Sequence, residues 1–317
     1  MYQYKKAAET HKHFIWLILL IGLLLFSSIP AAASASGPAG ATISGFYKQN
    51  GKTMYYKKGA PVTGEQKIGK YWYFFDANGV MRTGFREVPG KNKICYYNKK
   101  GHRVSGKQKI KGDDCFFNKK TGALESRIMN IIYVNQRQGI LQKGRWTHLE
   151  TVSARTYTGR LMRNCACGLD ASSMAISALK NKLVLPTKFN SRKYGFDGFD
   201  YKYNHGVKAT EKYGLHAKMQ ALTKKQMIQH LLKGHVVIVQ VTRSIYGGGG
   251  NVHGGDTGAT GHSHFILVHG YKDGKFAVAD SNNTSQTYVM SGRLKNWSTF
   301  AHHLRCGKKK SFCVVWK

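Results

Sequence analysis

The chain has 317 residues, of which 42% are hydrophobic, so it can bury a sizeable core and is long enough for two domains. It carries 50 lysines and arginines against 15 aspartates and glutamates, a net charge of +35. The basic residues are spread along the chain without a known DNA-reading motif, so we expect no nucleic-acid partner. Outside a cell, such a surface attracts polyanions.

The first 35 residues predict a signal peptide. A basic start containing Lys5 and Lys6 precedes the apolar run from Phe14 to Phe26, and the small residues of "AAASAS" follow. This order is typical of secretion signals. The apolar run is shorter than the roughly 20 residues of a membrane-spanning helix. We therefore expect cleavage near Ala33 or Ala35, a secreted protein, and no stable membrane span afterwards.

Residues 40–125 form a repeat. Aromatic pairs recur about every 20 residues, and each is followed by a glycine, namely Gly59, Gly79, Gly101 and Gly122. Short aromatic strands between glycine turns predict stacked β-hairpins. Exposed rings in such an array can bind sugars by stacking or choline by cation–π contact. The candidate wall-binding or glycan-binding residues are Tyr55, Tyr56, Trp72, Tyr73, Phe74, Phe85, Tyr96 and Tyr97.

One unit of this array, "GKYWYFFDANGVMRTGF" at residues 69–85, resembles the cell-wall-binding repeat of choline-binding and glucan-binding surface proteins. The resemblance implies that the protein associates with the cell wall, with a wall polyanion or glycan as its partner. Choline sites of that family use several tryptophans. This array has only Trp72, and Glu65 and Lys107 stand where tryptophan is common. Whether choline is bound therefore stays open.

Residues 126–317 predict a second domain with an α+β fold. "CGLDASSMAISALKNKL" has Ala171, Met174, Ala175 and Ala178 at helical spacing, and "TKKQMIQHLLKG" predicts a helix that ends at Gly234. The segments "HVVIVQV", 265–269 and "KFAVAD" are rich in strand-forming residues. The fold class we expect is thus an all-β hairpin array followed by an α+β domain.

Three residues of this domain suggest thiol chemistry. Cys167 lies where a helix should begin, a position that favours the thiolate form of a cysteine. His264 begins one predicted strand and Asp280 ends the next, across the turn "GYKDGK". Paired strands would bring His264 and Asp280 together at one end of the sheet. A histidine activates a thiol nucleophile, and a carboxylate orients the imidazole.

Three segments in this order resemble the papain-like peptidases related to the double-glycine leader peptidases of bacteriocin exporters. They are "CGLDASSMAI", "YGLHAKMQALTKKQMIQHLLKGHVVIVQV" and "GHSHFILVHGYKDGKFAVAD". The resemblance implies a papain-like cysteine peptidase acting on a peptide or protein, with Cys167, His264 and Asp280 as its triad. In that family a glutamine shortly before the cysteine stabilises the oxyanion. Here the nearest candidates are Gln136 and Gln138.

Other interpretations remain. Cys165 is a rival nucleophile, although it would precede the helix. The same thiol chemistry would suit an amidase or endopeptidase that cuts peptidoglycan stems. A catalytically inactive, wall-binding adhesin is the third alternative.

The remaining cysteines and histidines predict structural roles. Exported chains favour disulfides, and Cys95 with Cys115, or Cys306 with Cys313, could pair. His269 is expected to be structural. The set His253, Asp256, His262 and His264 contains possible zinc ligands, but it lies in a glycine-rich loop without regular spacing. We expect no metal and no other cofactor.

Overall fold

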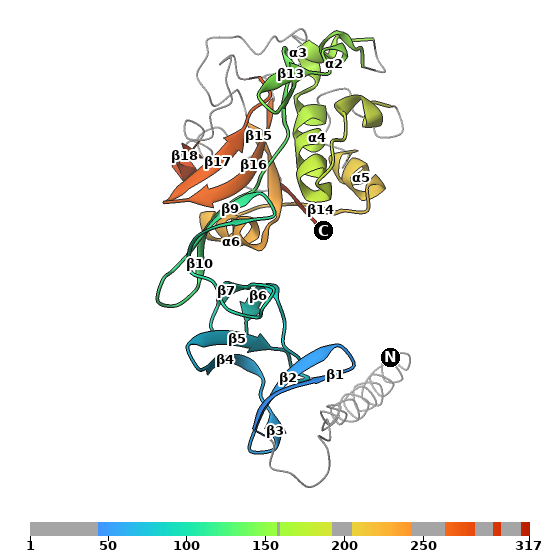
Figure 1. Ribbon diagram of the computed structural model, residues 1–317. Coiled ribbons are helices and arrows are strands. Elements are labelled where there is room, and N and C mark those ends of the chain that lie inside the picture. Colours follow the sequence, from blue (N-terminus) through green and yellow to red (C-terminus); the bar gives the residue numbers. More distant parts are fainter. Residues whose placement is uncertain (1–43, 157–158, 192–204, 242–263, 283–293, 299–311) are drawn as a thin grey trace, which may run out of the picture. The chain divides into compact units, whose positions relative to one another are not determined.

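The computed structural model describes residues 44–156, 159–191, 205–241, 264–282, 294–298 and 312–317 (Figure 1). The predicted signal peptide, residues 1–35, lies outside these ranges. The described part is mostly β-structure with some helices, and its sheets are open rather than closed into a barrel. No helix in it is long and apolar enough to cross a membrane.

The chain divides into two compact units. Unit 1 comprises residues 1–89 with 97–103, and unit 2 comprises residues 90–96 with 104–317. The described strands of unit 1 confirm the predicted repeated hairpins. Strands β1, β2 and β3 form a three-stranded antiparallel sheet, and β4 pairs with β5. Their bounds are β1 Gly45–Gln49, β2 Lys52–Lys57, β3 Ala60–Pro61, β4 Gly64–Ile68, β5 Tyr71–Phe75 and β6 Gly84–Val88.

The turns of the array need both glycine and a side-chain acceptor. Gly79 has φ +73, and a Cβ atom there would lie 2.8 Å from Cβ of Pro61, so the position requires glycine. Asp76 Oδ1 accepts hydrogen bonds from the N–H groups of Asn78 and Val80, both at 3.0 Å. Asn98 makes the same turn in the next unit. Side-chain acceptors of this kind stabilise tight turns.

Unit 2 is built on one nine-stranded sheet, in the order β14-β19-β15-β16-β10-β9-β8, with β17 paired to β16 and β18 paired to β17. A separate three-stranded sheet contains β11, β12 and β13. The bounds are β7 Lys93–Tyr97, β8 Gly106–Ile110, β9 Asp113–Phe117, β10 Leu124–Ile128, β11 Tyr133–Asn135, β12 Gly139–Gln142, β13 Arg145–Thr147, β14 His216–Gln220, β15 Val236–Val241, β16 His264–Lys272, β17 Lys275–Ala279, β18 Leu294–Lys295 and β19 Phe312–Trp316.

Two helices confirm the predictions made from spacing and caps. Helix α4 begins at Cys167, and α6 begins after Thr223, whose side chain forms a capping box with Gln226. Helix α6 ends at Gly234, which has φ +86. The bounds are α2 Glu150–Ser153, α3 Met162–Cys165, α4 Cys167–Lys180, η1 Pro186–Phe189, α5 His205–Lys212 and α6 Lys224–Lys233.

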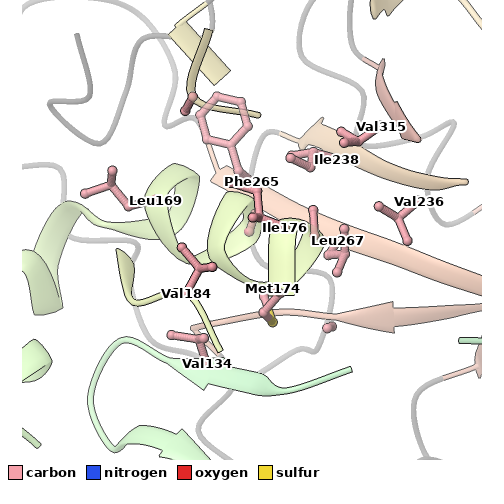
Figure 2. Close-up of a cluster of buried hydrophobic side chains, with 14 of the residues drawn as sticks. Val134, Leu169, Met174, Ile176, Val184, Val236, Ile238, Phe265, Leu267 and Val315 are labelled. Atoms are coloured by element: carbon pink, nitrogen blue, oxygen red, sulfur yellow. The ribbon is translucent and has the colours of Figure 1, made fainter. Parts of the chain in front are cut away.

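The sheet of unit 2 is covered on both faces. Figure 2 shows Leu169, Met174 and Ile176 of α4 among side chains of the sheet, including Phe265 and Leu267 of β16. Alternate strand residues face the other way and pack against Met227 and Leu231 of α6; they include Val237, Val239, Ile266 and Val268. Because α4 is buried almost completely, the position of its first residue is determined by the core.

The hairpin of β16 and β17 brings two predicted site residues to one end of the sheet. Asp273 and Gly274 form its turn, with φ +48 and +80. The antiparallel register pairs Leu267 with Ala279. His264, the first residue of β16, therefore lies close to Asp280, which directly follows β17.

One disulfide prediction is wrong. Cys115 is a free, buried thiol on β9, between β8 and β10. Strand β7, which carries Cys95, is not part of that sheet. Neighbouring repeats in the sequence thus do not place their central strands side by side. Burial raises the pKa of the Cys115 thiol to about 12, against the lowering effect of Arg127. The pairing of Cys306 with Cys313 stays a prediction, because Cys306 lies outside the described residues.

The sheet of unit 2 continues across the predicted domain boundary between residues 125 and 126. Strand β10 pairs with β9 on one side and with β16 on the other. Arg127 of β10 forms a largely buried ion pair with Asp113 of β9, 2.8 Å between Nη2 and Oδ2. The hairpin of β8 and β9 therefore extends the sheet that carries His264.

Candidate active site

The site is centred on Cys167, the first residue of α4, whose side chain is 4% exposed. Short helix α3 and Ala166 precede it, so two successive helical segments set its position. The N–H groups at the start of a helix lack partners within the helix and favour negative charge. Cys167 thus lies at the end of α4 where the N–H groups point.

His264 and Asp280 form the second part of the site. His264 Nε2 donates a hydrogen bond to Asp280 Oδ1 at 2.6 Å, and the two side chains are 1% and 0% exposed. The predicted proximity of these two residues is confirmed. Asp280 Oδ1 also accepts from the N–H of Asn282 at 2.9 Å, and Tyr133 Oη donates to the backbone oxygen of Asp280 at 2.6 Å. Asp280 is therefore held through both its carboxylate and its backbone oxygen.

The environment of His264 favours its protonated form. Burial alone would lower its pKa, but the charge of Asp280, the hydrogen bond to Asp280 and a hydrogen bond with Cys167 raise the pKa to about 10. Since Nε2 is engaged with Asp280, the other ring nitrogen is the one available to Cys167. The structure thus brings a thiol, an imidazole and a carboxylate together in that order.

Gln136, rather than Gln138, lies beside Cys167. It follows β11, is 7% exposed, and its N–H donates to the backbone oxygen of Ser281 at 2.9 Å. Its amide is satisfied when Oε1 accepts from the N–H groups of Ala166 and Cys167, at 3.0 and 3.2 Å. The hydroxyl of Ser281 lies 3.4 Å from the same amide group. Gln136 and Cys167 are far apart in the sequence, so this contact could not be predicted from the sequence.

Asp170 is a further acidic residue at the site that sequence reasoning missed. It lies on the first turn of α4 and is 2% exposed. Burial raises its pKa well above the ordinary value, against the lowering effects of a hydrogen bond from Ser281 and of the charge of His264. Its position within "CGLDASSM" was visible, but its burial beside the histidine was not.

The other cysteine and histidine candidates have different partners. Cys165 Sγ donates to the backbone oxygen of Leu161 at 3.3 Å, within its own helical segment. His269 Nδ1 donates to the backbone oxygen of Met129 at 2.9 Å, which agrees with the predicted structural role. His253, Asp256 and His262 lie outside the described residues. Among the residues that are described, no group of three or more potential ligands could hold a metal ion.

The predicted wall-binding aromatic residues fall into two groups. Tyr56, Tyr73, Phe74 and Tyr97 are at most 7% exposed and pack inside the array, so they offer no open ring face. The partly exposed residues are Tyr55, Trp72, Phe85 and Tyr96. Two exposed rings were not among the predicted site residues, Phe46 at 48% and Tyr71 at 39%.

The ring of Trp72 already carries a cation from the chain itself. The guanidinium of Arg103 lies 4.8 Å from the ring centroid. Arg103 Nη1 is also 2.7 Å from Glu65 Oε1, with the two side chains 8% and 1% exposed. Tyr97 Oη donates to the same carboxylate oxygen at 3.0 Å. A buried ion pair therefore occupies the space beside the ring.

A buried helix that begins with cysteine and packs on an antiparallel sheet carrying histidine is the arrangement expected of a thiol hydrolase. The model of the Peptidase_C39 like family matches residues 130–303, which is more than half of the chain. The chain therefore belongs to the Peptidase_C39 like family. A second family model, the choline-binding repeat, matches residues 62–105.

Several solved structures are similar to parts of the chain. Choline binding protein F from Streptococcus pneumoniae is 27% identical, with 29% of this chain and 30% of that chain covered and a TM-score of 0.25. The choline binding domain of Spr1274 in Streptococcus pneumoniae is 24% identical over 27% of this chain and 98% of that domain, with a TM-score of 0.23. The chain thus spans about a third of choline binding protein F, 30% and 34% in two of its structures. No curated protein matches the chain.

Proposed function

We propose that the protein is an exported, wall-associated cysteine peptidase with a papain-like catalytic domain, in which Cys167, His264 and Asp280 form the triad. The observation that carries the proposal is the position of His264, hydrogen-bonded to Asp280 through Nε2 and to Cys167. Membership of the Peptidase_C39 like family supports the reaction class, and the choline-binding repeat supports the location at the wall.

In the first half-reaction, the sulfur of Cys167 attacks the carbonyl carbon of the scissile bond. The imidazolium of His264 stabilises the negative charge on the sulfur before attack, and then donates its proton to the leaving amine. Loss of the amine leaves a thioester on Cys167. In the second half-reaction, His264 takes a proton from the attacking water, and the acid product leaves with the thiol restored. Asp280 orients the ring throughout.

The tetrahedral intermediate needs hydrogen-bond donors for its oxyanion. We assign the N–H of Cys167 and the side-chain amide of Gln136 to this task. Gln136 lies beside the start of α4, with its amide group within 3.2 Å of the N–H of Cys167, so a turn of that amide would bring its Nε2 to the oxyanion. Gln136 would thereby take the role that the family resemblance gives to a glutamine.

The repeat array would hold the enzyme on the wall through its basic surface and its partly exposed rings. A polyanion or glycan fits this better than choline, since Arg103 already occupies the face of Trp72. A quaternary ammonium would have to displace a cation that is paired with a buried carboxylate. The expected substrates are therefore peptides or proteins at the wall, including peptidoglycan stem peptides.

The test is mass spectrometry of purified protein incubated with a peptide library and with isolated peptidoglycan, under reducing conditions. We expect new peptide termini with the wild type and none with Cys167→Ala or His264→Ala. Cys165→Ala is the matched control, because Cys165 is also buried and precedes α4, and its activity should be retained. Cleavage by Cys167→Ala equal to the wild type would contradict the proposed mechanism. Cleavage confined to peptidoglycan would identify the stem peptides as the substrate.

A further inference from the structure

The strand pairing that leads to Asp280 ends one residue before it. Strands β16 and β17 pair as far as Leu267 and Ala279, so Asp280 is the first residue beyond the ladder. A ladder positions the backbone of its residues by regular hydrogen bonds, and a buried residue past its end needs other partners. The carboxylate of Asp280 nevertheless meets His264 Nε2 at 2.6 Å, with both side chains at most 1% exposed. The position of the Asp280 backbone therefore depends on contacts from outside the hairpin.

Tyr133 of β11 supplies such a contact. Its Oη atom donates to the backbone oxygen of Asp280 at 2.6 Å, across 147 positions of the chain. The side chain of Tyr133 is 2% exposed, and its ring packs near Trp146, with 6.1 Å between the ring centroids. Asn135 Nδ2 donates to the same hydroxyl at 3.4 Å. A ring that is packed in the core and also held at its oxygen keeps one orientation, so the hydroxyl is a rigid donor.

The same short strand also reaches the start of α4. Gln136 directly follows β11, and its N–H donates to the backbone oxygen of Ser281 at 2.9 Å. The side-chain amide of Gln136 meets the N–H of Cys167. Val134 of β11 is 1% exposed and packs in the core beside α4 (Figure 2). Strand β11 and the residue after it thus contact both the chain around Asp280 and the nucleophile.

We propose that Tyr133 is a positioning residue of the triad: its hydroxyl fixes the backbone oxygen of Asp280 and, through it, the place where the carboxylate meets His264. This inference rests on the proposed function. Without the hydroxyl, the chain after β17 would keep the bond from Gln136 to Ser281 but lose the one at Asp280 itself. The carboxylate could then shift relative to Nε2 of His264. Because hydrogen bonds weaken steeply away from their best geometry, such a shift would loosen the hold on the imidazolium.

The experiment compares Tyr133→Phe with Ser173→Ala in the full chain, using one cleaved peptide. Tyr133→Phe removes only the hydroxyl and keeps the ring that packs near Trp146. Ser173 is the matched control, because its buried hydroxyl also donates to a backbone oxygen at 2.6 Å, that of Val184. Tyr133→Phe should lower kcat by about 10-fold with little change in KM, since misplacing a catalytic group by about 1 Å can cost about 10²-fold. Ser173→Ala should leave kcat unchanged, although both variants should melt at a lower temperature than the wild type.

Two further measurements separate positioning from a general loss of stability. In an Asp280→Ala background, Tyr133→Phe should not lower kcat further, because no carboxylate remains to be positioned. Proton NMR of the hydrogen on His264 Nε2, which lies in the bond to Asp280, gives a signature that does not depend on turnover. Its low-field signal should move upfield in Tyr133→Phe as that bond weakens, and should stay in place in Ser173→Ala.

The outcomes distinguish this inference from the proposed function. Either a kcat equal to that of Ser173→Ala or an unmoved proton signal in Tyr133→Phe would overturn the positioning role alone. No turnover by the wild type above that of Cys167→Ala would instead overturn the proposed function.

Discussion

At the scale of single residues, the site depends on a buried charge. Asp280 is fully buried, and its carboxylate is the acceptor for His264 Nε2 and for the N–H of Asn282. Together with Cys167, it holds the pKa of His264 at about 10 despite the opposite effect of burial. The imidazolium is therefore stable at neutral pH, and the carboxylate both charges and orients the ring.

Asp280→Asn tests this dependence. The amide keeps the shape of the side chain but removes the charge, so the pKa of His264 should fall. We expect kcat/KM to drop by about 10²-fold, less than the roughly 10⁴-fold known for the equivalent change in serine-type triads, since a thiol depends less than a hydroxyl on a base that removes its proton. The alkaline limb of the pH profile should move to lower pH, because the imidazolium then loses its proton sooner.

Cys167→Ala and His264→Ala are the reference variants for that comparison, and a thermal melt checks folding. Both should lose more activity than Asp280→Asn. Full activity of Asp280→Asn with an unshifted pH profile would remove Asp280 from the triad.

A second prediction at this scale concerns the two ion pairs of unit 1. Arg103 is paired with Glu65 in the interior, whereas the Arg82–Asp76 pair is partly exposed, with Arg82 at 47%. Arg103→Ala leaves a buried carboxylate without its cation and should cost about 3–5 kcal/mol. Arg82→Ala should cost about 1 kcal/mol or less. Denaturant unfolding of both variants measures this, and equal losses would show that Glu65 is not held by Arg103.

At the scale of secondary-structure elements, helix ends and hairpins fix the geometry of the site. Helix α6 ends at Gly234, and α5 is followed by Gly214, both with positive φ. Arg127 of β10 lies over Gly234, and its Nη1 donates to the backbone oxygen of Leu232 at 3.4 Å. Strand β10 is thus tied to the helix that covers one face of the sheet.

Gly234→Ala and Gly214→Ala form a matched pair. Both substitutions place alanine in the left-handed region, which costs about 1–2 kcal/mol. At Gly234 a Cβ atom would also lie 2.5 Å from Arg127 Nη1, while at Gly214 it would meet open space. We therefore expect a larger drop in melting temperature for Gly234→Ala. Equal drops in melting temperature would mean that the Arg127 side chain moves away from the new Cβ atom without a cost in stability.

At the scale of the whole molecule, the last hairpin of the array belongs to the sheet of unit 2. A chain starting at residue 126 lacks β8, β9 and part of β10, which leaves a new strand edge and removes Asp113 from Arg127. It should melt at a lower temperature and aggregate more than a chain starting at residue 104. Equal melting temperatures and equal peptide turnover for the two chains would support the predicted boundary at 125/126.

Retention on the cell wall is the second property of the whole molecule. The full chain should cosediment with isolated walls, and salt should weaken this binding because a net charge of +35 acts on polyanions. The chain starting at residue 104 should be retained less while keeping its peptide turnover. If the chain starting at residue 104 were retained as well as the full chain, unit 1 would act only as a spacer. Release of the full chain by choline at constant ionic strength would contradict our preference for a polyanion or glycan.

Features with a local cause could be predicted from the sequence. The glycine-punctuated hairpins, the capping box and glycine stop of α6, and the β16–β17 hairpin each follow from a few adjacent residues. The proximity of His264 and Asp280 followed as well, because antiparallel pairing across a short turn leaves little freedom. The family match, over residues 130–303, includes Cys167, His264 and Asp280. Their catalytic role remains for the experiments above.

Contacts between distant segments were decided only by the tertiary structure. Gln136 reaches Cys167 because β11 packs against α4, and Ser281, two residues after the end of β17, reaches Asp170 on the first turn of that helix. Arg103 covers Trp72 because successive hairpins stack, and Cys115 stays unpaired because its strand joins a different sheet from β7. Periodicity and turn residues report on neighbours along the chain. Burial and long-range packing, which raise the pKa of Asp170 and bring Gln136 to Cys167, depend on how those elements meet.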